Sequence, residues 1–141
     1  MISGIDIEDF KDFNQDLEKK PVTLLDYFKE FDDLTLKTYQ AECATTAIYD
    51  SQFNVLYPLI GLIGELGEFC NKFGKVLRDN NGDITPELLT EAELELGDSF
   101  WMFMQLLTGL GLCSEKVAKI NLAKLKSRKE RGTLRGKGDF R

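Results

Sequence analysis

Histidine is absent from this chain of 141 residues, and its absence excludes several large classes of enzyme. Imidazole serves as ligand or base in His-ligated zinc sites, in Ser-His-Asp and Cys-His catalysis, in HD-type phosphohydrolases and in the Glu-x-x-His sites of di-iron bundles. None of these chemistries is open to this protein. Any metal binding or proton transfer must therefore rest mainly on its carboxylates.

Cysteines and long apolar runs are also scarce. Cys43, Cys70 and Cys113 are widely spaced, lack the Cys-x-x-Cys spacing of metal and redox sites, and lie in or beside apolar segments, so we interpret them as reduced core residues. No uninterrupted apolar run approaches the roughly 20 residues that cross a bilayer, and the acidic N-terminus does not match a secretion signal. We expect a soluble cytoplasmic protein, in the host cytoplasm if the chain is viral, with no membrane partner.

Sustained alternation of apolar and polar residues is rare as well, so the chain is predicted to be all-α. Its length and its 43% hydrophobic content suffice for one packed domain. Helices are predicted over about 36–49, 53–78, 86–109 and 115–130. Thr85 should cap the third of these helices, with Pro86 in its first position. Short connections make the last three helices antiparallel neighbours in a bundle.

Charge is unevenly distributed around a net charge of −6. The first 50 residues carry twelve acidic and five basic side chains, whereas residues 116–141 carry ten basic and two acidic ones. We therefore divide the chain into an acidic N-terminal extension over 1–33, a helical domain over 34–131 and a basic, glycine-rich tail over 132–141. The acidic net charge argues against general nucleic-acid binding, because phosphate backbones repel an acidic surface.

Four carboxylates in the helical domain form two equally spaced pairs, Glu65 with Glu68 and Glu95 with Asp98. Side chains at i and i+3 lie about 5–6 Å apart on one helix face, so each pair can reach a single ion. If the two helices are antiparallel neighbours, the pairs can face each other. Converging carboxylates without imidazole or clustered thiolates favour a hard, oxygen-preferring cation, above all Mg²⁺, with Mn²⁺ as a substitute.

One such pair is common on surface helices, but the surroundings of these two favour a bound ion. Residues 86–110 contain five acidic side chains and no lysine or arginine. Like charges one turn apart cost about 0.2–0.5 kcal/mol per pair, and the cost grows beside the run Phe100 to Met104, which must be partly buried. A bound cation would offset this repulsion. We therefore interpret the four acids as candidate metal ligands.

Basic and amide side chains accompany the acidic pairs. Cations beside a carboxylate-held Mg²⁺ are the usual arrangement around a polyphosphate, because the ion and the bases share the charge of the ligand. The candidate substrate contacts of this kind are Lys72, Lys75, Asn121, Lys124 and Arg128. Bases near the end of a helix also complement its dipole, which explains Lys72 and Lys75 equally well. Trp101 is a candidate for stacking on a base, although such aromatics more often belong to the core.

Glycines recur every third residue on the second predicted helix, at Gly61, Gly64 and Gly67. A glycine in a helix interior costs about 1 kcal/mol relative to alanine. Three on one strip therefore indicate the close approach of the third helix or of a second subunit.

Three runs of sequence contain most of these candidates: GLIGELGE from Gly61 to Glu68, ELGD from Glu95 to Asp98, and NLAKL from Asn121 to Leu125. Together with Trp101 and the basic residues between and after them, they resemble the MazG-like nucleotide pyrophosphohydrolases. The resemblance covers roughly residues 36–141. It is closest to the compact single-domain type that phages often carry.

This resemblance implies an antiparallel α-helical bundle completed by homo-oligomerisation, as a dimer or a tetramer. It further implies Mg²⁺-dependent conversion of nucleoside triphosphates, ribo or deoxy, to the monophosphate and pyrophosphate. The four acids would be the metal ligands, and the lysines, Asn121 and Arg128 would contact phosphate or sugar. One position departs from the family pattern: many members carry a further Glu, proposed as the base for the attacking water, where this chain has Gly64. A ligand carboxylate such as Glu68, or the metal alone, would then activate the water.

Two other functions remain open at the level of sequence. Phosphoribosyl-ATP pyrophosphohydrolase shares the bundle and the acidic pairs and differs in its substrate. A non-catalytic helical interaction module would instead use the acidic N-terminal segment and the basic tail to bind another macromolecule.

Overall fold

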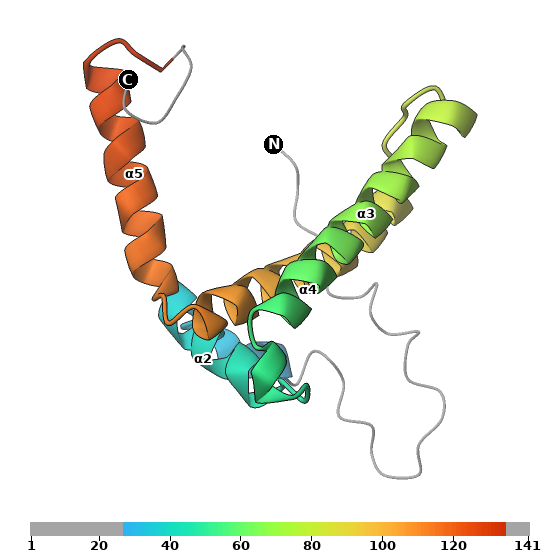
Figure 1. Ribbon diagram of the computed structural model, residues 1–141. Helices are drawn as coiled ribbons and strands as arrows, with labels where there is room; N and C mark the ends of the chain where they lie inside the picture. The colour runs from blue at the N-terminus through green and yellow to red at the C-terminus, as the bar shows by residue number, and fades with distance from the viewer. Residues whose placement is uncertain (1–26, 135–141) are drawn as a thin grey trace. The chain divides into compact units, whose positions relative to one another are not determined.

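The computed structural model describes residues 27–134, and all regular structure in this range is helical (Figure 1). The predicted all-α class is therefore confirmed. The 3-10 helices are η2 (Lys29–Phe31) and η3 (Ser51–Phe53). The α-helices are α2 (Leu36–Thr45), α3 (Leu56–Asp79), α4 (Pro86–Gly109) and α5 (Ser114–Glu130). The chain divides into two compact units, residues 1–35 and 36–141, and the second contains all four of these α-helices. Most of the predicted acidic extension and basic tail lies outside the described residues.

The third predicted helix has the boundaries that its capping residues indicate. The Thr85 hydroxyl oxygen accepts a hydrogen bond from the backbone N–H of Leu88 at 3.3 Å, and Pro86 takes the first helical position, where no N–H is needed. The connection from α3 turns through Asn81 and Gly82, both with positive φ, at 54° and 84°. This short turn returns the chain so that α4 can run back along α3.

The first predicted helix is shorter than expected, because α2 ends at Thr45 rather than Tyr49. The hydroxyl groups of Thr45 and Thr46 donate hydrogen bonds to backbone carbonyls three residues earlier. Such local bonds offer the backbone an alternative to a continued helix. Asp50 then caps η3, since its carboxylate accepts from the backbone N–H of Gln52 at 2.9 Å.

The two long helices α3 and α4 pack along each other as an antiparallel pair, as predicted (Figure 1). Leu88, Ala92 and Ser99 are buried on α4 at helical spacing. Gly61 marks a close contact, since a Cβ there would lie 2.5 Å from Sδ of Met102. By contrast, a Cβ at Gly64 would meet nothing within 4 Å. The same is true at Gly67, so α4 explains only the first of the three glycines.

The prediction that the last three helices are antiparallel neighbours in one bundle is wrong for α5. It packs instead against α2 and leaves the α3–α4 pair (Figure 1). Gln40 on α2 fixes this junction: its amide nitrogen donates to Thr108 Oγ1 at 3.1 Å and to the Leu112 carbonyl at 2.8 Å, and its amide oxygen accepts from the N–H of Ser114 at 2.8 Å. A single amide therefore joins α2 to the end of α4 and the start of α5.

A small core lies where α2, α4 and α5 meet. Cys43, Met104 and Leu107 are its buried members, and the partly buried residues packed against them are Tyr39, Trp101, Phe103 and Val117. The three cysteines are free, as predicted, but only Cys43 belongs to the core, because Cys70 and Cys113 are exposed. The buried amide of Gln105 donates to the Cys43 carbonyl and thereby joins α2 to α4.

A second apolar strip on α3 is not covered by α4. It recurs at alternating spacings of four and three residues, the pattern of a helix that packs against another helix, and consists of Leu56, Ile60, Ile63, Gly67, Cys70, Gly74 and Leu77. Its leucine and isoleucine side chains are 54–71% exposed. We call this strip the outer seam. None of the described helices is nevertheless long and apolar enough to span a membrane.

Candidate functional site

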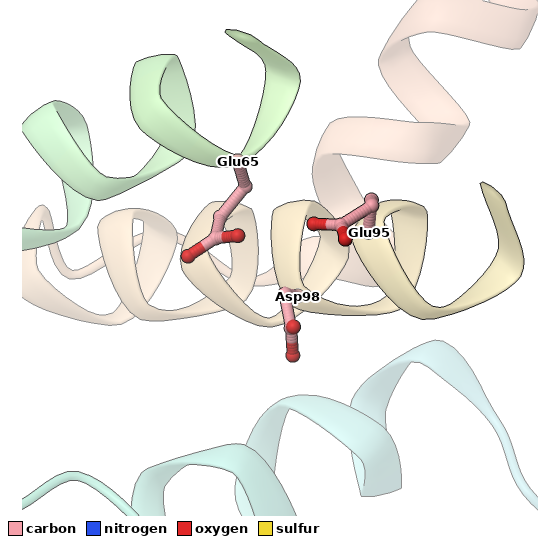
Figure 2. Close-up of side chains that lie close together, drawn as sticks. All are labelled: Glu65, Glu95 and Asp98. Carbon is pink, nitrogen blue, oxygen red and sulfur yellow. The ribbon is translucent and has the colours of Figure 1, made fainter. Parts of the chain in front are cut away.

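Three of the four predicted metal ligands come together between α3 and α4. Glu65 reaches from α3 toward α4, and Glu95 and Asp98 project from α4 (Figure 2). Each offers a carboxylate oxygen, and these oxygens all lie within 4.8 Å of one another. The antiparallel packing explains the meeting, because the contact between Gly61 and Met102 places the next turns of the two helices level with each other. We call these three residues the acidic cluster.

Glu68, the fourth predicted ligand, lies one turn along α3 from Glu65 and is exposed. It does not share the mutual spacing of the acidic cluster. Its negative charge nevertheless acts on the acidic cluster. The pKa of Glu65 is raised mainly by burial, and the negative charges of Asp98, Glu68 and Glu95 raise it further. The four acids therefore repel one another, and a positive charge among them would be stabilised.

Lys72 supplies one such charge. Its ammonium nitrogen lies 2.9 Å from Oε2 of Glu91 and 3.2 Å from Oε1 of Glu95. Hydrogen bonds to these two carboxylates raise the pKa of Lys72. The sequence predicted Lys72 as a substrate contact, and in the structure it is the counter-ion of two acids on α4. Glu91 is thus part of the site, one turn before Glu95, although it was not among the predicted ligands.

The chemistry of the acidic cluster fits a hard divalent cation. All three donors are carboxylate oxygens. The chain has no histidine, and no cysteine of the described residues belongs to the cluster. Two oxygens bound to one Mg²⁺ at about 2.1 Å are at most about 4.2 Å apart. The oxygens of the acidic cluster lie up to 4.8 Å apart, slightly more than this maximum, so a modest side-chain rotation brings them within range of one ion. Asp98 is exposed and has room for such a rotation.

Tyr39 on α2 lies close enough to the acidic cluster to sense the charge of Asp98, although the sequence did not predict this. Burial is the main cause that raises its pKa, and the charge of Asp98 contributes. Its ring stacks on that of Phe100, with centroids 4.8 Å apart and planes inclined by 11°. The Asp98 carboxylate therefore projects toward the side of α4 on which α2 lies (Figure 2). Nothing in the spacing of Tyr39 indicated this proximity, which depends on how α2 packs.

The predicted contacts on α5 are not brought to the acidic cluster within this chain. Asn121 is exposed, Lys124 is half-buried and Arg128 is buried. They lie on a helix that packs against α2 and not along α3 (Figure 1). Lys75 is exposed on α3, beyond Lys72 toward the end of the helix. Lys72 is therefore the one predicted substrate contact that the structure places at the acids.

Trp101, the predicted stacking residue, is engaged in the core. Its indole N–H donates to the Thr46 hydroxyl at 2.8 Å, and its ring meets that of Tyr49 edge-on, with centroids 6.4 Å apart. The half-buried indole packs against the buried core residues. These contacts account for the tryptophan without a bound base.

Comparison with known proteins identifies a relative. The Gene 37 protein of Mycobacterium phage L5 is 43% identical to this chain over 109 residues, which cover 73% of this chain and 96% of the phage protein. No protein-family model matches the sequence, and no solved structure matches it. The aligned stretch spans nearly the whole relative and most of this chain. The chain belongs to the same family as the Gene 37 protein of Mycobacterium phage L5.

Proposed function

We propose that this protein is a Mg²⁺-dependent nucleoside triphosphate pyrophosphohydrolase of the MazG-like type. The observation that carries the proposal is the meeting of Glu65, Glu95 and Asp98 across α3 and α4. Glu65 is 30 or more residues from Glu95 and Asp98 in sequence, yet the three carboxylates converge. No imidazole or thiolate of the described residues joins them, and Lys72 lies beside Glu95. The resemblance of GLIGELGE and ELGD to the MazG-like motifs supports the same reaction, and the phage relative accords with a compact phage-type member.

The acidic cluster would hold Mg²⁺, which would neutralise the phosphate oxygens and help to ionise water. Water would attack the α-phosphorus, and the bond from that phosphorus to the oxygen bridging the α- and β-phosphates would break, so that pyrophosphate leaves. The exposed Glu68 carboxylate lies near the cluster but outside it. We assign it the role of accepting the proton of the attacking water, since Gly64 offers no side chain for this step. Lys72 would balance the charge of the phosphates.

A product analysis tests the reaction class. The purified chain is incubated with each common ribo- and deoxynucleoside triphosphate and with phosphoribosyl-ATP, in Mg²⁺ or in a chelator, and products are identified by phosphorus NMR. We expect a nucleoside monophosphate and pyrophosphate, formed only with the metal. Preference for phosphoribosyl-ATP would reassign the substrate. Release of orthophosphate, or no turnover of any substrate, would contradict the proposal and favour a non-catalytic interaction module.

A second copy of the chain would complete the fold. The outer seam of α3 exposes leucine and isoleucine at helix-packing spacing, and open space surrounds Gly64 and Gly67. Burying the exposed part of each such side chain contributes on the order of 1 kcal/mol. The seam runs from Leu56 to Leu77, about 32 Å along the helix. A helix of a second copy matches this surface in length and chemistry, and a dimer or a dimer of dimers would result.

Mass measurement tests this assembly. We expect the protein, 16.0 kDa as a single chain, to show at least twice that mass by light scattering. Ile63→Glu should shift the mass toward that of the monomer, because it places a charge in the outer seam. Lys116→Glu, an exposed position on α5, is the matched control and should leave the mass unchanged. A wild-type protein that is monomeric at every concentration would contradict the proposed oligomer.

A further inference from the structure

The ammonium group of Lys72 contacts two carboxylates, one inside the acidic cluster and one outside it. The nitrogen lies 3.2 Å from Oε1 of Glu95, which belongs to the cluster, and 2.9 Å from Oε2 of Glu91, which does not. Glu91 and Glu95 are one turn apart on α4. The lysine thus sits between a carboxylate that a divalent cation would use and one that the cation would leave alone.

A divalent cation at the cluster and the ammonium group of Lys72 compete for the same carboxylate. Both are positive, and charges a few ångströms apart near a protein surface interact by about 1–4 kcal/mol per unit charge. Their simultaneous close contact with Glu95 is therefore unfavourable. The 29% exposure of the Lys72 side chain and the 55% exposure of Glu91 leave both with room to move away from Glu95.

We infer that Lys72 exchanges one counter-ion for another when a divalent cation binds, leaving Glu95 and remaining with Glu91. This exchange sets the affinity of the acidic cluster for the metal. Lys72 neutralises Glu95 before the metal binds, and Glu91 retains the lysine once Glu95 turns to the metal. The displaced ammonium group stays beside the site, where it contacts a phosphate oxygen of the ligand. This inference rests on the proposed function, and it assigns Glu91, which is not a metal ligand, a positioning role that acts through Lys72.

The exchange predicts effects of opposite sign for the two partners of one ion pair. Lys72→Met removes the competitor and should raise affinity for Mn²⁺ roughly tenfold, the scale of one charge at a solvent-accessible site. Glu91→Gln leaves Lys72 with Glu95 alone and should lower the affinity severalfold. In the double variant the Glu91 change should have little further effect, because its influence passes through the lysine. A lysine that merely supports the structure would give weaker metal binding in Lys72→Met.

The experiment is a calorimetric titration of the full chain with MnCl₂ at fixed pH and ionic strength. Lys37→Met, an equal charge change on the exposed surface of α2, is the control and should alter the affinity no more than about twofold, because salt screens distant charges. Inorganic pyrophosphate is then titrated in saturating Mn²⁺, and Lys72→Met should bind it more weakly than the wild type. Tighter metal binding together with weaker pyrophosphate binding is the combined result expected.

The outcomes separate this inference from the proposed function. If the wild type binds Mn²⁺ and Lys72→Met binds it equally or more weakly, the exchange is overturned while the metal site stands. An equal loss from Glu91→Gln with and without Lys72 would likewise overturn it, because Glu91 would then act only through its own charge. A wild type that binds no Mn²⁺ would overturn both the metal site and the exchange.

Discussion

Replacing Asp98 with Asn is expected to abolish Mg²⁺-dependent release of pyrophosphate while leaving the helical fold intact. Asp98 supplies one of the three carboxylate oxygens of the acidic cluster, and an amide of the same size offers a neutral, weaker donor to a hard cation. Loss of one of three charged ligands should weaken metal binding by at least about 100-fold, since even outer-shell changes cost about 10–100-fold. Asp98 is exposed, so its replacement empties no core position.

Glu93→Gln is the matched control for this variant. Glu93 lies on the same helix, is exposed and stands outside the acidic cluster, so the variant removes an equal charge without removing a ligand. Its turnover should remain close to that of the wild type. Both variants are compared by Mn²⁺ titration, by initial rate of pyrophosphate release and by circular dichroism. Full turnover in Asp98→Asn, with the wild-type dependence on Mg²⁺, would remove Asp98 from the site.

Replacing Gly109 with Ala is expected to destabilise the protein by about 3 kcal/mol or more, although alanine is the better helix former. Gly109 is the last residue of α4, and a Cβ there would overlap the backbone carbonyl of Asn54, just before α3. A backbone group cannot rotate away as a side chain can. The end of α4 or the connection into α3 must therefore shift, and the core around Met104 and Leu107 lies within two turns.

The control lies on the same helix. A Cβ at Gly97 would meet nothing within 4 Å, so Gly97→Ala should stabilise the protein by about 0.5–1 kcal/mol through helix propensity alone. Urea unfolding followed by circular dichroism, at one protein concentration, measures both changes. Similar midpoints for Gly109→Ala and the wild type would show that the α4 end can move away from Asn54 at little cost.

The sequence predicted those features that depend on local chemistry. Thr85 and Pro86 located the start of α4, because a cap and a proline act within one turn. The spacing within each acidic pair, together with the antiparallel arrangement of α3 and α4, was sufficient to expect Glu65 near Asp98. These inferences needed only helix periodicity and a short connection.

The features that the sequence did not reveal depend on tertiary packing. The position of α5 against α2 is set partly by the hydrogen bonds of Gln40, whose partners are about 70 residues away. For the same reason Asn121, Lys124 and Arg128, which were predicted to contact the substrate, do not reach the acidic cluster within this chain. The pairing of Lys72 with Glu91 and Glu95 likewise depends on how α3 and α4 are aligned. The periodicity of the sequence predicts which face of a helix a residue occupies. It does not predict which residue of another helix lies next to it.

The turn at Asn81 and Gly82 bears on the order in which the protein folds. Because it closes a short loop between two long helices, α3 and α4 can find each other at little entropic cost, before the more distant contacts of α2 and α5 form. The hairpin of α3 and α4 contains both the acidic cluster and Lys72, so the like charges of the three carboxylates and the ammonium group that partly offsets them come together in the same step.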